Sequence, residues 1–289
     1  MEYIATLLTQ IAIYVVAVAA LDLLLGYAGI ASLGHAAFIG IGAYTAAIFA
    51  TTLHLGFILS LVASIGVTSL IALAVGIPTL RLSGDYFVLA TFGLGSVTSA
   101  VLLNWVDVTN GPFGIYGIPV LDVFGARLIS PGRFLIVAAA VMAIVLIVKQ
   151  LLVRSPFGVV LRAVGADELV AAVSGKNVTL LRVTVFIIAG AGAAVAGVLQ
   201  AYDLRFIDPT LFTIQLTVFV WAALYVGGCG SWLGNIVGPL LLFGMPEALR
   251  FVGLAGTTVA EIRDILYGAL LIAVTIYRPQ GIAGTYRVR

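Results

Sequence analysis

Residues 134–153 read FLIVAAAVMAIVLIVKQLLV, a run in which Lys149 is the only charge. A helix needs about 20 consecutive apolar residues to cross a hydrocarbon layer about 30 Å thick. Similar runs recur along the chain. Because lipid offers no hydrogen-bond partner to a peptide group, and because the runs are much longer than barrel strands, each predicts a helix. The chain is therefore predicted to be an all-α, polytopic transmembrane helix bundle.

The expected bundle has about nine spans, within a range of eight to ten. They are Ile4–Leu25, Leu33–Thr52, Phe57–Gly76, Tyr86–Leu103, Phe134–Val153, Val183–Ala201, Leu211–Val226, Ser231–Leu249 and Ile265–Tyr277. The second and eighth are rich in glycine, which leaves open whether they are broken or partly re-entrant.

The composition excludes two broad classes of protein. Of 289 residues, 62% are hydrophobic and 9% are charged, whereas soluble chains carry about 25% charged residues. So few charges could not solvate the surface of an ordinary soluble enzyme. The net charge of +2 comes from scattered residues and not from a basic stripe, which excludes a nucleic-acid binder. Cys229 is the only cysteine, so no intrachain disulfide is expected.

The distribution of Lys and Arg predicts the orientation, because cytoplasmic loops carry an excess of them. The loop 104–132 is expected outside and the loop 154–182 inside. Nine of the fourteen basic residues then fall inside or at the inner boundary, namely Arg81, Lys149, Arg154, Arg162, Lys176, Arg182, Arg278, Arg287 and Arg289. The C-terminus is expected in the cytoplasm. The start, Met1-Glu2-Tyr3, lacks the basic residues of a cleaved signal, so the first run is expected to be a retained helix.

The loop 154–182 has the pattern of a short helix outside the membrane. Asp167 and Glu168 favour a first turn, and Gly175 stands where a helix stop is expected. The expected apolar face consists of Leu169, Val170, Ala172 and Val173. Such a helix can lie on the membrane or dock into a groove on a partner. The alternative is a solvated connector that packs on its own bundle.

Five stretches with distinctive glycine and turn patterns follow one another along the chain. They are GYAGIASLGHAAFIGIGAY (26–44), LRLSGDY (80–86), NGPFGI (110–115), GGCGSWLG (227–234, followed by Gly238-Pro239) and YRPQGI (277–282). One such match is unspecific, but five in order over nearly the whole chain are specific. In these residues the chain resembles the branched-chain amino acid permease family of ABC transporters, and within it the LivM-like member of the permease pair.

The resemblance implies a function and a set of partners. It implies one permease domain over residues 1–289, the membrane-spanning subunit of an ATP-driven importer for branched-chain or related hydrophobic amino acids. The implied location is the bacterial or archaeal cytoplasmic (inner) membrane. The implied partners are two ATP-binding cassette subunits, a second homologous permease, an extracytoplasmic substrate-binding protein and membrane lipid. No cofactor and no nucleic acid is expected.

The loop 154–182 resembles the cytoplasmic coupling loop of such importers, whose short helix inserts into a cleft on the ATPase. The generic loop has Glu-Ala-Ala followed by Gly, and this chain departs from it with Glu168, then Ala171-Ala172, then Gly175. The resemblance assigns ATPase coupling to Asp167, Glu168, Leu169, Ala172, Val173 and Gly175.

The stretch 26–44 holds the candidates for the translocation pathway. Its glycines are dense enough to loosen a helix, and a broken helix at membrane depth is tolerated where it meets protein or a watery cavity. Free N–H groups there can face an anionic group such as a carboxylate. Ser32, His35 and Tyr44 are therefore candidates for lining the pathway, with packing as the alternative. The small residues between Gly190 and Gly197 are expected to serve close helix packing.

Other chemistries find little support in the residues. Asp22 is expected near the inner end of the first span, where its carboxylate can reach water. No two acidic residues are expected deep in a span with a basic partner, so no proton relay or sodium site is visible. His35 and His54 are too few and too far apart for a metal site. The chain has no Gly-x-x-x-x-Gly-Lys-Ser/Thr loop, so ATP hydrolysis is expected on separate chains. The alternatives are a secondary transporter or channel for a small solute acting without ATPases, and a membrane-embedded enzyme, for which no catalytic cluster is visible.

Overall fold

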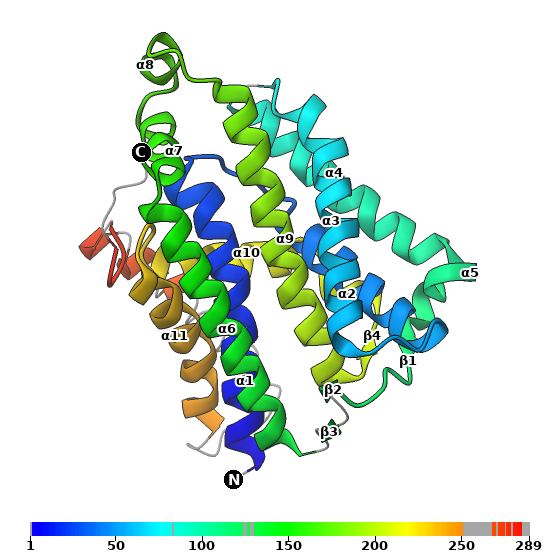
Figure 1. Ribbon diagram of the computed structural model, residues 1–289. Coiled ribbons are helices and arrows are strands. Elements are labelled where there is room, and N and C mark those ends of the chain that lie inside the picture. The colour runs from blue at the N-terminus through cyan, green and yellow to red at the C-terminus, as the bar shows by residue number, and fades with distance from the viewer. Residues whose placement is uncertain are drawn as a thin grey trace.

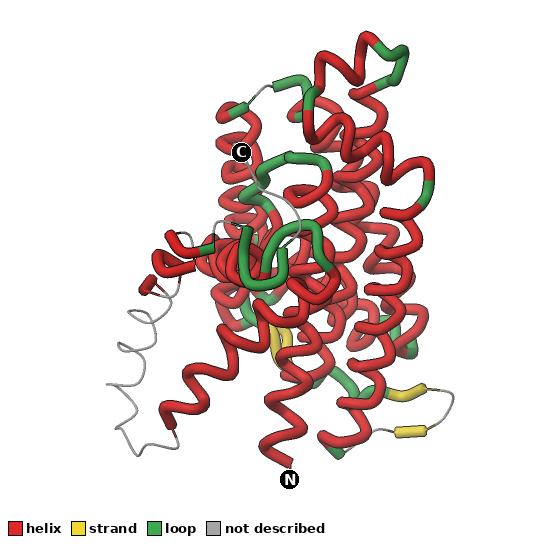
Figure 2. Tube along the Cα trace, turned by 90° about the vertical axis from the view of Figure 1, so that its left-hand side faces the viewer, coloured by secondary structure: helices red, strands yellow, loops and turns green. Residues whose placement is uncertain are grey.

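The computed structural model describes residues 2–82, 84–123, 126–127, 130–250, 268–269, 271–274, 276–278 and 280–284. These residues form a helical bundle, with α1 and α6 side by side and α9 between them and α3 (Figure 1). Strands are short and lie in the half of the molecule nearer the N-terminus (Figure 2). The prediction of an all-α, polytopic bundle is confirmed.

The long helices are α1 (Glu2–Asp22), α2 (His35–Thr52), α3 (Phe57–Thr79), α4 (Asp85–Asn104), α6 (Pro131–Arg154), α9 (Val178–Leu204), α10 (Ile214–Gly227) and α11 (Trp232–Arg250). The shorter ones are the π-helix η1 (Leu23–Tyr27), α5 (Val106–Thr109), η2 (Gly111–Phe113), α7 (Pro156–Ala166), α8 (Glu168–Val173) and η3 (Pro209–Phe212). Strands β1 (Ile115–Tyr116) and β4 (Phe206–Ile207) pair antiparallel, as do β2 (Asp122–Val123) and β3 (Ala126–Arg127).

Among the described residues, six helical segments are long and apolar enough to cross a membrane: α1 continued by η1, then α2, α3, α4, α6 and α9. They correspond to the first six expected spans. The seventh and eighth expected spans correspond to α10, which has 14 residues, and to α11. The ninth, Ile265–Tyr277, is described only in the pieces 268–269, 271–274 and 276–277, which are helical.

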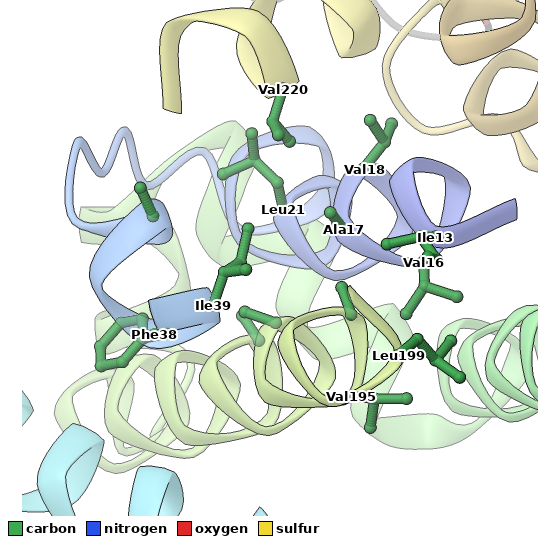
Figure 3. Close-up of a cluster of buried hydrophobic side chains, with 14 of the residues drawn as sticks. Ile13, Val16, Ala17, Val18, Leu21, Phe38, Ile39, Val195, Leu199 and Val220 are labelled. Carbon is green, nitrogen blue, oxygen red and sulfur yellow. The ribbon is translucent and has the colours of Figure 1, made fainter. Parts of the chain in front are cut away.

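The core lies where α1, α2, α9 and α10 meet (Figure 3). Val16 and Leu21 of α1 are fully buried there, beside Leu199 of α9 and Val220 of α10. Because these side chains are fully buried, α1 and α9 lie inside the bundle, although both have the apolar composition of lipid-facing helices. Composition alone therefore did not separate central helices from peripheral ones.

Glycines allow α2 and α9 to approach closely. A Cβ atom at Gly197 would lie 2.0 Å from the carbonyl oxygen of Ile39, and one at Gly42 would lie 2.4 Å from the Cα atom of Ala194. Small residues are what brings membrane helices into backbone contact. The predicted packing role of the stretch from Gly190 to Gly197 is confirmed.

Helical continuity is interrupted between α1 and α2. The π-helix η1 follows Asp22, and residues 28–34 are not helical before α2 begins at His35. The second expected span is thus continuous from His35 onward, and the break precedes it. Helix α10 lies across the bundle behind α1 and α9 (Figure 1). Its Phe219 ring meets Tyr14 of α1, with 5.3 Å between ring centroids.

Candidate functional site

The segment α7–α8 projects at the end of the bundle opposite to the start of α1 (Figure 1). Helix α7 begins with Pro156 in its first turn, a position where the missing N–H costs nothing. Leu161 and Val164 are buried and hold the helix against the bundle. This helix was not predicted. The spacing of Phe157, Leu161 and Val164 would have indicated it, because such residues share one helical face.

Helix α8 begins and ends as expected. The Asp167 side chain accepts hydrogen bonds from the N–H groups of Leu169 (2.9 Å) and Val170 (3.1 Å), which is an N-cap. Gly175 follows the helix in a left-handed conformation with φ of 76°, which favours glycine. Glu168, the first residue of the helix, forms an ion pair of 2.9 Å with Arg182 of α9. The predicted short helix in this loop is confirmed.

The expected apolar face of α8 is not the face that packs on the bundle. Ala171 is the buried residue, and it contacts Val164 and Val178. Leu169 and Val173 are 78% and 90% exposed, and Ala172 is exposed as well. One small apolar side chain and the Glu168–Arg182 ion pair therefore anchor α8, while its large apolar side chains are exposed.

Helix α7 touches the break between α1 and α2 through backbone atoms. A Cβ atom at Gly165 would lie 2.5 Å from the carbonyl oxygen of Tyr27 and 3.3 Å from the nitrogen of Gly29. Gly29 itself has φ of 66°. The α7–α8 segment thus packs directly on residues 27–29. A displacement of α7 would therefore move the backbone of these residues.

The three pathway candidates are all buried. Ser32 accepts a hydrogen bond from Gly34 N–H at 3.3 Å, and its carbonyl accepts one from the Trp221 indole at 3.1 Å. The His35 ring contacts the Ala17 carbonyl at 2.9 Å, so its Nε2 donates. Tyr44 stacks edge-on against Phe212, and its buried hydroxyl has no hydrogen-bond partner among the described residues. None of the three is among the residues that line the four clefts around His54, Phe92, Phe219 and Glu168.

A buried ion pair joins α1 to α6. Lys149 forms a salt bridge with Asp22, although the two side chains are only 4% and 0% exposed. The other carboxylate oxygen of Asp22 accepts the Gly230 N–H at 2.8 Å. This overturns the expectation that the carboxylate of Asp22 reaches water. Sequence reasoning missed the pair because Asp22 and Lys149 are 127 residues apart.

Further groups complete this buried cluster. The Tyr27 hydroxyl donates to the Gly230 carbonyl at 2.7 Å, and the Lys149 ammonium lies 5.6 Å from the centroid of the Tyr27 ring. With its amide group oriented by these neighbours, fully buried Asn235 donates to Asp22 at 3.2 Å and accepts from Lys149. The cluster therefore fastens η1, α6 and the connection between α10 and α11 to one another.

Comparison with known proteins identifies the family. Residues 3–275 match the model of the branched-chain amino acid transport system / permease component family. The chain belongs to this permease family. It is an integral membrane protein, as the apolar helices also indicate, and the resemblance found in its glycine-rich stretches is confirmed.

The relatives carry matching names. The high-affinity branched-chain amino acid transport system permease protein LivM of Salmonella typhimurium is 31% identical over 95% of this chain and 68% of the relative. LivM of Escherichia coli is 30% identical over 93% of this chain and 67% of the relative. The permease protein LivH of Salmonella typhimurium is 37% identical over 45% of this chain and 40% of the relative. No solved structure matches the chain.

Proposed function

We propose that this chain is the membrane-spanning permease subunit of an ATP-driven importer that carries branched-chain or related hydrophobic amino acids. The observation that carries the proposal is the family match over residues 3–275 together with two LivM relatives at about 30% identity along nearly the whole chain. The permease itself performs no chemistry on the substrate.

The proposed assembly contains two ATP-binding cassette subunits, a second homologous permease of the LivH kind and an extracytoplasmic substrate-binding protein. The likeness to both LivM and LivH supports a pair of related permeases. These 289 residues contain no phosphate-binding Gly-x-x-x-x-Gly-Lys-Ser/Thr loop, which supports ATP hydrolysis on other chains. We place the assembly in a bacterial or archaeal cytoplasmic membrane, with the α7–α8 segment and the C-terminus in the cytoplasm.

Helix α8 is proposed to dock into the ATPase. Its Leu169 and Val173 side chains are exposed on the described part of the chain and are four residues apart, so they share one face. The Asp167 cap and the Glu168–Arg182 ion pair hold the helix in shape, and Gly175 ends it. Ala172 lies exposed beside the docking residues.

Movement of α8 is proposed to reach the spans through α7. Gly165 is in close backbone contact with residues 27–29. The non-helical residues 28–34 that begin there form hydrogen bonds with two other helices. The Leu33 N–H donates to Thr91 of α4 at 3.0 Å, and the Ser32 carbonyl accepts from Trp221 of α10. This places Ser32 on the proposed route of motion. His35 and Tyr44 stay proposed as residues near the pathway.

The test replaces both Leu169 and Val173 by Asp in the complete transporter. An unpaired carboxylate buried in an apolar docking cleft costs several kcal/mol, so the ATPases should dissociate during purification or hydrolyse ATP without uptake. The bundle should stay folded, because both side chains are exposed. Lys176→Gln is the matched control, since an exposed charge in the same loop contributes little. Normal ATP-driven uptake by the double variant would contradict the docking role.

A second candidate, a secondary transporter that works without ATPases, is favoured by one observation. Ionisable groups inside membrane spans serve as proton relays in such proteins, and Asp22 with Lys149 is a buried acid–base pair. Both groups are enclosed by the cluster around Gly230 and Asn235 and are almost fully buried, which supports a structural role instead. Concentrative uptake by the isolated chain, driven by a proton or sodium gradient, would establish the second candidate.

A further inference from the structure

A cleft of about 280 Å³ opens on the flank of the bundle between α4 and the start of α10. It is also lined by Leu33, in the break between α1 and α2, and by Ala36 at the start of α2. Ser96 of α4 lies eleven residues after Asp85 and eight before Asn104, the two ends of the helix. At 1.5 Å per residue these separations are about 16 Å and 12 Å, so the cleft lies near the middle of the span.

Polar groups are exposed at this cleft, in contrast to two other flanks. Ser96 and Gln215 are both exposed and line the cleft. On α3 from Ile58 to Ile77, and on α6 from Ile136 to Val148, every exposed residue is aliphatic or glycine. An amide exposed to lipid at mid-depth loses its hydrogen bonds to water without compensation. The α3 and α6 flanks therefore suit lipid, and the flank at the cleft suits water or a solute.

The residues that line the cleft suit a small solute without net charge. None of its described lining residues is ionisable, so a net-charged solute would meet no compensating charge. Hydroxyl and amide groups can donate and accept, and so can serve both an ammonium and a carboxylate. Those groups belong to Ser96, Ser99, Thr213, Gln215 and Thr217. The Ser96 hydroxyl donates to the Phe92 carbonyl at 3.3 Å and can still accept, whereas Thr217 accepts the Ala36 N–H at 3.0 Å. The apolar wall is formed by Leu33, Phe92 and Ile214.

We propose that this cleft is the mid-membrane binding site for the transported solute, a small, net-neutral molecule with a polar head and an aliphatic side chain. The proposal rests on the transport function proposed above and adds the residues that hold the solute. Ser96, Ser99 and Gln215 would bind its polar head. Phe92 and Ile214 would contact its side chain.

Single cysteines test the proposal, because the native Cys229 is buried. Ser96→Cys and Gln215→Cys are prepared in the full transporter complex, with Leu70→Cys and Ile144→Cys as mid-helix controls on the α3 and α6 flanks, where the native side chains are 66% and 59% exposed. The complexes, in proteoliposomes, are treated with a charged, water-soluble methanethiosulfonate. A thiol must ionise to react, so it reacts in water and not in lipid.

The expected result is that Ser96→Cys and Gln215→Cys react at least about tenfold faster than the two controls, and that leucine slows them whereas lysine does not. Reaction of Ser96→Cys no faster than Ile144→Cys would overturn the proposal, as would labelling that leucine leaves unchanged. Cysteine labelling can be measured without transport. A negative labelling result would therefore contradict this site and not the proposed transport function. A complex that imports leucine while Ser96→Cys stays unreactive would contradict the site alone.

Discussion

Replacing Lys149 with Met tests whether the buried cluster holds the bundle together. Methionine keeps the length of the side chain but removes the cation that faces Asp22. Both native side chains are almost fully buried. Removal of one partner of a buried pair leaves an uncompensated charge and destabilises a protein by about 3–5 kcal/mol. At about 2–4 °C per kcal/mol for a domain of 150–250 residues, the melting temperature should fall by roughly 10 °C.

A second substitution should restore much of this loss. In the Asp22→Asn, Lys149→Met double variant neither buried charge remains, and an asparagine oxygen can still accept the Gly230 N–H that Asp22 accepts at 2.8 Å. The double variant should therefore melt above either single variant, with a coupling free energy of at least about 2 kcal/mol between the two sites.

The assay is thermal unfolding of the detergent-solubilised chain for the wild type, both single variants and the double variant. Lys176→Gln is the control, because Lys176 is exposed and its loss should change the melting temperature by less than about 2 °C. Additive losses in the double variant, or a Lys149→Met variant as stable as the wild type, would refute the reasoning.

Other predictions concern packing and the α7–α8 segment. Gly197→Ala should lower the free energy of unfolding by at least about 3 kcal/mol, since its Cβ atom would lie 2.0 Å from a backbone oxygen. Gly66→Ala is the control, because its Cβ atom would have no neighbour within 4 Å, and it should leave the melting temperature unchanged or raise it. Asp167→Ala should weaken α8 by about 1 kcal/mol, visible as faster amide exchange confined to residues 168–174, whereas exchange throughout the loop would contradict the cap. Gly165→Val should lower ATP-driven uptake without loss of assembly, because it must lift α7 from residues 27–29; uptake at the wild-type rate would remove α7 from the proposed route of motion.

Much of the fold could be predicted because the length of an apolar run can be read directly from neighbouring residues in the sequence. The run 134–153 identified α6, and similar runs identified α1 to α4 and α9, within a few residues of their ends. The helix α8 was predictable for the same reason, since Asp167 and Gly175 are close in sequence to the residues that they cap. Helix α7 has an equally local pattern and was overlooked.

Features that depend on tertiary contacts could not be predicted in this way. The pairing of Asp22 with Lys149 requires α1 and α6 to lie side by side. The buried face of α8 is set by contact of Ala171 with Val164 and Val178, two residues outside the helix. The cleft between α4 and α10 likewise combines residues more than one hundred positions apart.

One measurement decides whether the chain works as an ATP-dependent permease. Proteoliposomes that contain this chain, its partner permease and the two ATP-binding subunits are supplied with the substrate-binding protein and radiolabelled leucine, with or without ATP on the side of the ATPases. The proposed function predicts accumulation of leucine above its external concentration only when ATP and every subunit are present. Equal accumulation without ATP, or by this chain alone, would contradict it.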